Sequence, residues 1–234
     1  IAKLKASELS NWRKERLADA EMLRQNTTFA ELAQAYFKNP QDVSAHTQIQ
    51  TWLESYQIYG YDRVRLLDTQ GKTILSAPVS APPNSSVVAQ RIPEVLQSKQ
   101  VVMVDFYYSD TDQRIDLAIL IPILNSQSGD QVIGLVSFSV NPKTYLYPYI
   151  NEWPSDSTSS ETLLVRREGN DVLYLNEIRF DPNSALTLKF PMTDTQLLAV
   201  KAVLGQSGVV QGQDYRGKSV LGDVRPVPNS PWFL

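Results

Sequence analysis

The sequence predicts an α+β protein in which a long N-terminal helix carries two modules, each a five-stranded antiparallel sheet with flanking helices. Three observations predict this class: helical periodicity before residue 60, strand-like alternation after Gly60, and the repetition of one order of elements in the second half. With 234 residues, of which 42% are hydrophobic and 20% charged, the chain is long enough to bury a core in each module.

The first 59 residues are expected to be helical. Apolar residues recur at roughly helical spacing through residues 3–37, with charged residues between them. The run Asn26-Thr27-Thr28 resembles a cap at which the helix restarts, and Asn39-Pro40 ends it. A further helix is expected over residues 43–57. Residues 1–59 therefore form the N-terminal helical segment.

Residues 60–140 form the first predicted module. A hairpin is expected from the strand-like runs 64–68 and 72–76, and a helix candidate over residues 86–99 is broken early by Pro93. Polar turn segments separate the strands that follow. Three long strands are expected, at residues 100–108, 114–124 and 131–140.

Residues 141–234 repeat this order and form the second predicted module. It begins with a short aromatic helix or turn at residues 141–151, and a helix is expected over residues 194–204. In both modules the strand before the last one ends with proline, at Pro122 and Pro226. The expected strands are residues 161–167, 172–176, 209–215, 219–227 and 230–234.

Composition excludes several classes of protein. The net charge is −3 and no Lys/Arg run exceeds two residues, so no nucleic-acid partner is expected. The absence of cysteine excludes disulfides, thiol catalysis and zinc–thiolate sites. The longest apolar run, residues 117–124, is too short to span a membrane. Because the chain starts at Ile1 and ends at Leu234 within a predicted strand, we expect it to be a fragment of a longer protein.

Catalytic residue patterns are weak in this sequence. His46 is the only histidine, and most catalytic triads and transition-metal sites would need it. The carboxylates Glu152, Asp156 and Glu161 could supply a glycosidase pair, but they lie in a Ser-rich polar loop that is more typical of a solvated surface. The segment Asp110-Thr-Asp112 is a weak calcium candidate. We therefore predict no catalytic residue, no metal and no cofactor.

Acidic and aromatic residues mix in one segment, Asp105-Phe-Tyr-Tyr-Ser-Asp110, where a predicted strand enters a turn. A period of two places Asp105 and Tyr107 on the same face of that strand. A carboxylate among apolar neighbours is costly unless it is paired. Two interpretations stay open: Asp105 bonds a loop at the sheet edge, or the segment forms one wall of a small-molecule pocket.

A set of short motifs resembles a known family. The motifs are most frequent after residue 140, in the order Asn141-Pro, Tyr145-Leu-Tyr-Pro, Glu152-Trp-Pro-Ser, Glu161-Thr-Leu-Leu-Val-Arg-Arg-Glu-Gly169, Val172-Leu-Tyr-Leu-Asn176, Asp214-Tyr-Arg-Gly217 and Arg225-Pro-Val-Pro-Asn-Ser-Pro-Trp-Phe-Leu234. Together they look like the second half of a double Cache (tandem PAS-like) sensor domain. The N-terminal segment Trp12–Ala20 is similar to the first helix of the same family.

The resemblance implies an extracytoplasmic, periplasmic location between two transmembrane helices. Such domains pass a signal to a cytoplasmic histidine kinase, diguanylate cyclase or chemoreceptor module. By analogy, residues 60–140 would be the membrane-distal module that binds the ligand. Residues 141–234 would be the membrane-proximal module that transmits the signal. The long N-terminal helix would support a homodimer.

The resemblance also implies a site for a small polar ligand. Tyr108-Ser109-Asp110 matches one piece of the amino-acid-binding motif of the family, but Ile92-Pro93-Glu94 replaces the Trp-Tyr expected after Arg91, and Ser139 stands where an Asp is expected. Asp105 with Tyr107 looks like the acidic–aromatic pair of the kinase-linked branch. The predicted ligand-binding residues are Asp105, Tyr107, Tyr108, Asp110, Ser139 and Arg65.

Two functions are therefore carried forward. The first is a ligand sensor of a membrane receptor, with a histidine kinase as the expected output. The alternative is a module without its own ligand, which receives a partner protein or relays a signal through the helix. A distal module filled by Met103, Phe106 and Leu117 would favour the second function.

Overall fold

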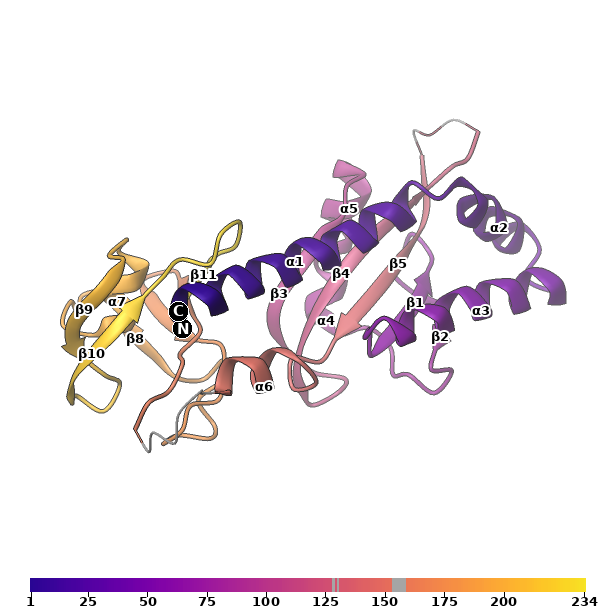
Figure 1. Cartoon of the computed structure of the whole chain (residues 1–234). Helices are drawn as coiled ribbons and strands as arrows, with labels where there is room; N and C mark the ends of the chain where they lie inside the picture. The colour runs from indigo at the N-terminus through magenta and orange to yellow at the C-terminus, as the bar shows by residue number, and fades with distance from the viewer. Residues whose placement is uncertain (128, 130, 153–158) are drawn as a thin grey trace. The chain divides into compact units, whose positions relative to one another are not determined.

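The computed structural model describes residues 1–127, 129, 131–152 and 159–234, and it forms two compact units (Figure 1). The central unit comprises Glu15–Pro142. The C-terminal unit comprises Ile1–Lys14 with Lys143–Leu234. The predicted α+β class is confirmed, with a long N-terminal helix and a five-stranded antiparallel sheet.

Three helices open the chain: α1 (Ala2–Arg24), α2 (Thr27–Lys38) and α3 (Val43–Ile58). The predicted restart is confirmed, because Asn26 Oδ1 accepts a hydrogen bond from the backbone N–H of Phe29 at 2.9 Å and caps α2. Asp42 caps α3 in the same way, through Ser44 N at 2.9 Å. None of the described helices is both long and apolar enough to cross a bilayer.

The central unit is built on one antiparallel sheet with the strand order β2-β1-β5-β4-β3. The hairpin and the three long strands expected from the sequence all form. Their bounds are β1 (Arg63–Leu67), β2 (Thr73–Ala77), β3 (Val102–Ser109), β4 (Arg114–Leu124) and β5 (Val132–Val140).

Helices cover both faces of this sheet (Figure 1). On one face, α4 (Ser86–Ala89) and α5 (Ile92–Ser98) pack on a core that includes Leu67, Leu120 and Leu135. Pro93 lies in the first turn of α5, where a missing N–H costs no helical hydrogen bond, so the expected break comes just before it. On the other face, Tyr56 of α3 contacts Phe138 of β5, with 4.8 Å between ring centroids.

The C-terminal unit has two sheets, with the orders β11-β6-β7-β8 and β10-β9. The expectation of one five-stranded sheet in this module is therefore wrong in detail. After β10 the chain continues through Pro226, which has no N–H for a ladder, and residues 225–227 bond to the end of the chain instead. Arg225 N donates to Leu234 O, and Val227 N donates to Trp232 O, both at 2.8 Å.

The elements of this unit are short. A strand that the sequence did not predict, β8, extends the larger sheet. The bounds are α6 (Leu146–Asn151), β6 (Val165–Glu168), β7 (Asp171–Tyr174), β8 (Lys189–Pro191), α7 (Leu198–Val203), β9 (Gly208–Gln213), β10 (Ser219–Val224) and β11 (Trp232–Phe233).

Two glycines let α7 lie close to the β9–β10 hairpin. A Cβ atom on Gly222 would come within 2.6 Å of Leu198 Cδ1, and one on Gly212 within 2.7 Å of the Gln196 carbonyl oxygen. At Gly212 the clash would be with the backbone, so this position requires the absence of a side chain, whereas at Gly222 a Cβ atom would displace the end of the Leu198 side chain.

Candidate ligand-binding site

Polar side chains occupy one end of the sheet face that α4 and α5 cover. The register pairs Arg63 with Ser139 and Arg65 with Ser137 across β1 and β5. Because side chains alternate along a strand, these residues share the face of Leu67 and Leu135, which belong to the core under α4 and α5. The same face therefore carries apolar packing at one end and charged groups at the other.

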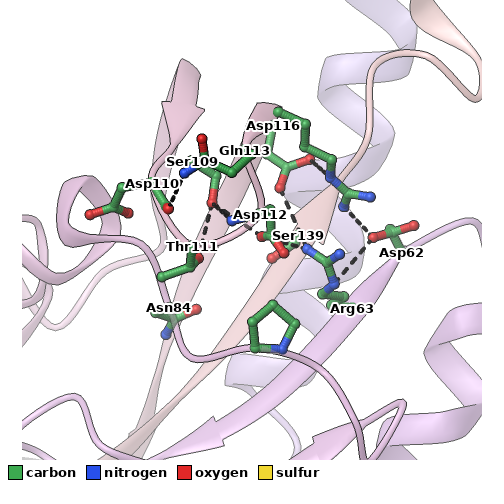
Figure 2. A network of polar contacts seen from close by, with 12 residues as sticks. Asp62, Arg63, Asn84, Ser109, Asp110, Thr111, Asp112, Gln113, Asp116 and Ser139 are labelled. Atoms are coloured by element: carbon green, nitrogen blue, oxygen red, sulfur yellow. Dashed lines mark hydrogen bonds and ion pairs between the residues drawn. The ribbon is translucent and has the colours of Figure 1, made fainter.

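Five charged residues form what we call the Arg/Asp network: Asp62, Arg63, Asp112, Arg114 and Asp116. Figure 2 labels all of them except Arg114. Arg63 Nη1 lies 2.5 Å from Asp112 Oδ2 and 3.8 Å from Asp116 Oδ2. Arg114 Nε donates to Asp116 Oδ1 at 2.9 Å, and Arg114 also pairs with Asp62. The side chains of Asp112 and Asp116 are 6% and 1% exposed. The network is thus a set of opposite charges held largely out of water.

Arg65 and Ser139, both predicted from the sequence, are brought together beside this network. Arg65 is 1% exposed, and its Nη1 donates to Ser139 Oγ at 2.9 Å. Its Nε donates to the carbonyl oxygen of Pro82 at 3.0 Å, which holds the loop before α4 over the sheet. Burial, and then the nearby Arg63, lower the pKa of Arg65. The loop makes a second contact with the sheet through Asn84, whose Oδ1 atom accepts a hydrogen bond from Ser137 Oγ at 3.3 Å.

Asp116 is the most perturbed carboxylate of the network. Burial raises its pKa to about 6, against the opposite effect of Arg114. The neighbouring carboxylate of Asp112 raises this pKa further. Asp116 lies opposite Tyr107 in the β3–β4 register, and burial followed by Asp116 raises the pKa of Tyr107. The Tyr107 hydroxyl therefore stays protonated at neutral pH.

We expect Asp116 to make the protein more stable at mildly acidic pH than at neutral pH. Its pKa of about 6 in the folded chain lies above the roughly 4 of an unfolded aspartate, so the unfolded chain loses its proton first as the pH rises. This contribution is fully present below a pH of about 4 and is lost as the pH rises through about 6. Urea unfolding of the wild type and of Asp116→Asn across this range measures it.

The control for this measurement is Asp110→Asn, because the pKa of Asp110 is about 2 in the folded chain, so its contribution to stability rises rather than falls as the pH rises through about 4. We expect the stability of the wild type relative to Asp116→Asn to fall with rising pH. A difference that stays constant from about pH 4 to about pH 7 contradicts the assignment.

Asp105 and Tyr107 do not share a face, so the period-two expectation is wrong. Between Val104 and Tyr107 the strand contains a bulge: Val104 pairs with Ala118 and Tyr107 with Asp116, so two intervening residues on β3 lie opposite one on β4. Tyr107 therefore joins Val104 in the core under α4 and α5. The Asp105 Oδ1 atom accepts from the N–H of Phe106 at 2.8 Å.

Tyr108 and Asp110 lie at the turn after β3. Tyr108 is exposed, and its hydroxyl donates to Gln113 Oε1 at 3.2 Å. Asp110 accepts from the backbone N–H of Ser86 at 3.1 Å, and hydrogen bonds from Ser85 and Ser86 lower its pKa to about 2. Asp110 therefore anchors the start of α4 to the turn.

The predicted ligand-binding residues did not include Asn84 or any residue of the Arg/Asp network, and Asp112 was named only as part of the weak calcium candidate. The alternation Arg63-Val-Arg65 in a strand was a usable signal, because it places two cations on one face. Asp116 had no such signal, since its face depends on strand register. Asn84 reaches the sheet from a loop, which periodicity cannot place.

The catalytic candidates do not form a site in the described residues. His46 is exposed on α3, and its ring centroid lies 5.9 Å from that of Tyr36. Asp156 and most of the Glu152-Trp-Pro-Ser motif lie outside the described residues. Within the described parts of the chain, no three His, Cys, Asp or Glu side chains gather to hold a metal ion.

Comparison with known proteins gives structural neighbours, whereas no family model and no curated protein matches the chain. The ligand-binding domain of Pseudomonas fluorescens chemoreceptor CtaA with L-isoleucine is 16% identical, with a TM-score of 0.61 over 99% of this chain and 86% of that one. The ligand-binding domain of Pseudomonas aeruginosa PAO1 chemoreceptor PctC with GABA is 17% identical, with a TM-score of 0.62 over 99% of this chain and 93% of that one.

The ligand-binding domain of Pseudomonas aeruginosa PAO1 chemoreceptor PctB with L-Gln is 18% identical, with a TM-score of 0.63 over 99% of this chain and 85% of that one. The chain therefore has the fold of these chemoreceptor ligand-binding domains. The double Cache fold implied by the sequence motifs is confirmed at this level.

Proposed function

We propose that the chain is the extracytoplasmic small-molecule sensor domain of a transmembrane signalling receptor. In this proposal the ligand binds on the sheet face under α4 and α5, at the end that carries the Arg/Asp network. The fold shared with ligand-binding domains of chemoreceptors supports the class of protein. The polar atoms at this face support the place of binding and the chemistry of the ligand.

One observation carries the proposal: three buried polar atoms on this face have no hydrogen-bond partner among the described residues. They are Arg63 Nη1, Asn84 Nδ2 and Asp116 Oδ2. The contact between Arg63 Nη1 and Asp112 is close enough for an ion pair but is not aligned as a hydrogen bond. Buried polar groups normally have partners, so unmatched ones at a site indicate a missing ligand or water.

These atoms define the class of ligand. Arg63 and Asn84 offer N–H donors, which suit a carboxylate, and Asp116 offers an acceptor, which suits an ammonium group. A small zwitterion carries both groups. The neighbours are complexes with L-isoleucine, GABA and L-Gln, which belong to this class. We therefore propose amino acids and related zwitterions as the first ligands to test.

Isothermal titration calorimetry with L-isoleucine, L-glutamine, L-arginine and GABA tests the proposal. We expect saturable binding of at least one of them, and a loss of about tenfold or more in affinity in Arg65→Met, since Arg65 positions Ser139 and the loop that carries Asn84. Arg91→Met is the matched control, because Arg91 pairs with Glu94 at the surface. Circular dichroism checks that both variants fold.

Two results would overturn the site. The first is that no zwitterion, free carboxylate or free amine of the same size binds at millimolar concentration. The second is that Arg65→Met binds as tightly as Arg91→Met.

In this proposal residues 60–140 are the membrane-distal module and residues 141–234 the membrane-proximal one, carried by the helical segment of residues 1–59. The domain is periplasmic and tethered to the cytoplasmic membrane in the full-length receptor. A homodimer through the N-terminal helix and a histidine kinase output in a two-component system are further parts of the proposal. Sedimentation with and without ligand tests the dimer.

A second candidate function is a module that relays a signal without its own ligand. It is favoured by the fact that each charged residue of the Arg/Asp network already faces an opposite charge. A network of this kind is stable without an occupant. Failure of the whole ligand panel would favour this candidate.

A further inference from the structure

A cavity of about 610 Å³ lies within the C-terminal unit, in the part of the molecule that the proposed function does not use for ligand. Its walls come from the start of α1, residues 159–163, β6, β7, α7, the β9–β10 hairpin and Leu234. Two of the lining strands, β6 and β10, belong to different sheets. The volume falls within the roughly 300–1,000 Å³ typical of small-molecule sites.

Most of the wall is apolar. Val165 of β6, Leu198 and Ala199 of α7, and Val220 of β10 all line the cavity. An aliphatic or aromatic body would bury its surface against them, which is the main source of affinity in such sites.

The carboxylate of Glu161 lies at the cavity wall, and Arg216 interacts with its charge at a longer range than an ion pair. Glu161 Oε2 accepts hydrogen bonds from the backbone N–H of Arg179 at 3.1 Å and from the Tyr215 hydroxyl at 3.3 Å, and forms no ion pair within the described parts of the chain. By contrast, Asp214 pairs with Arg216 at 2.6 Å and Asp223 with Arg225 at 2.7 Å. Among the described carboxylates of the wall, Glu161 is therefore the one without an ion pair.

Two hydroxyls of lining residues are also unmatched. Tyr174 Oη and Thr162 Oγ1 are buried and have no hydrogen-bond partner among the described residues. A hydroxyl oxygen can accept from an N–H group as well as donate. Burial, and then the hydrogen bond to Glu161, raise the pKa of Tyr215 to about 12, so its hydroxyl stays protonated and keeps donating to Glu161.

We propose that this cavity is a second small-molecule site, for an organic ammonium ion with an apolar body. The ammonium group pairs with Glu161 and donates to the hydroxyls of Tyr174 and Thr162, and the body lies against Val165, Leu198 and Val220. The site is independent of the one on the central sheet, so each can be present without the other.

Titration calorimetry with three probes of the same shape tests this proposal: phenethylammonium, 2-phenylethanol and 3-phenylpropionate. We expect phenethylammonium to bind most tightly, and Glu161→Gln to weaken it about tenfold, since an ionised partner strengthens a hydrogen bond by this order. Glu168→Gln is the matched control, because Glu168 is an exposed carboxylate on β6 of the same unit. Arg65→Met should keep the affinity, which separates this site from the central one.

Val220→Phe fills the cavity and should abolish binding of the ammonium probe, with folding checked by circular dichroism. If that variant does not fold, the affinities of Glu161→Gln and Glu168→Gln for the ammonium probe decide whether the site is assigned correctly. The proposal is overturned if none of the probes binds at millimolar concentration, if the carboxylate or the alcohol binds as tightly as the ammonium, or if Glu161→Gln keeps the affinity of the wild type.

Discussion

Arg114→Leu is expected to lower the free energy of unfolding by about 3 kcal/mol at neutral pH. The reason is that Arg114 Nε is the hydrogen-bond donor to Asp116 Oδ1, at 2.9 Å, and the Asp116 side chain is 1% exposed. Without Arg114 the buried carboxylate keeps Arg63, at 3.8 Å, as its remaining ion-pair partner among the described residues. Urea unfolding of the two proteins measures the difference.

A double variant separates the lost pair from lost packing. Arg114→Leu with Asp116→Leu removes both charges, and we expect it to recover most of the stability, because an apolar pair of similar volume often replaces a buried ion pair without cost. Arg91→Leu is the exposed control, with an expected loss of less than about 1 kcal/mol. A loss in Arg114→Leu no larger than in Arg91→Leu would show that the network adds nothing to stability.

Tyr61→Ala is expected to lower the free energy of unfolding by about 3–5 kcal/mol. Tyr61 is 1% exposed, and its ring centroid lies 4.3 Å from that of Phe138 on β5. The guanidinium carbon of Arg16 lies 4.9 Å from the same ring. Removal of the ring leaves a cavity between the sheet and the helices on this face, and chemical denaturation measures the cost.

Tyr61→Phe isolates the hydroxyl. It keeps the ring and loses the hydrogen bond from Tyr61 Oη to Asp19 Oδ2 at 2.9 Å, with an expected cost of about 1 kcal/mol. The half-exposed Tyr145 supplies a control, since Tyr145→Ala should cost much less than Tyr61→Ala. Equal losses in Tyr61→Phe and Tyr61→Ala would contradict the argument from packing.

The order of the helices and strands was largely predictable, because periodicity and capping signals are local. Asn26 caps α2 where the sequence predicts a restart, and Pro93 marks the start of α5. The bulge between Val104 and Tyr107 was not predictable, since an extra residue in a strand depends on pairing with β4. The same reason explains the divided sheet of the C-terminal unit, where residues 225–227 leave β10 to pair with the chain end.

The candidate site was predictable only where residues share a strand with a clear pattern. Arg65 and Ser139 were expected, and they form a hydrogen bond of 2.9 Å. Asp105 and Tyr108 were expected in the site because of a motif, but neither belongs to the Arg/Asp network. The bulge sets the position of Asp105, and Tyr108 bonds Gln113 at the turn. Asp116 and Asn84 were missed, because strand register and loop position bring them to the face. Tertiary pairing, which no local pattern encodes, assembles the polar end of the sheet.

The balance of charge around Arg65 has a kinetic consequence. Arg63, Arg65 and Arg114 lie beside Asp62, Asp112 and Asp116, so the cluster has no net charge and its field largely cancels within about 10 Å in physiological salt. A solute without net charge gains nothing from long-range steering. Association at this face should therefore proceed at a rate that ionic strength barely changes.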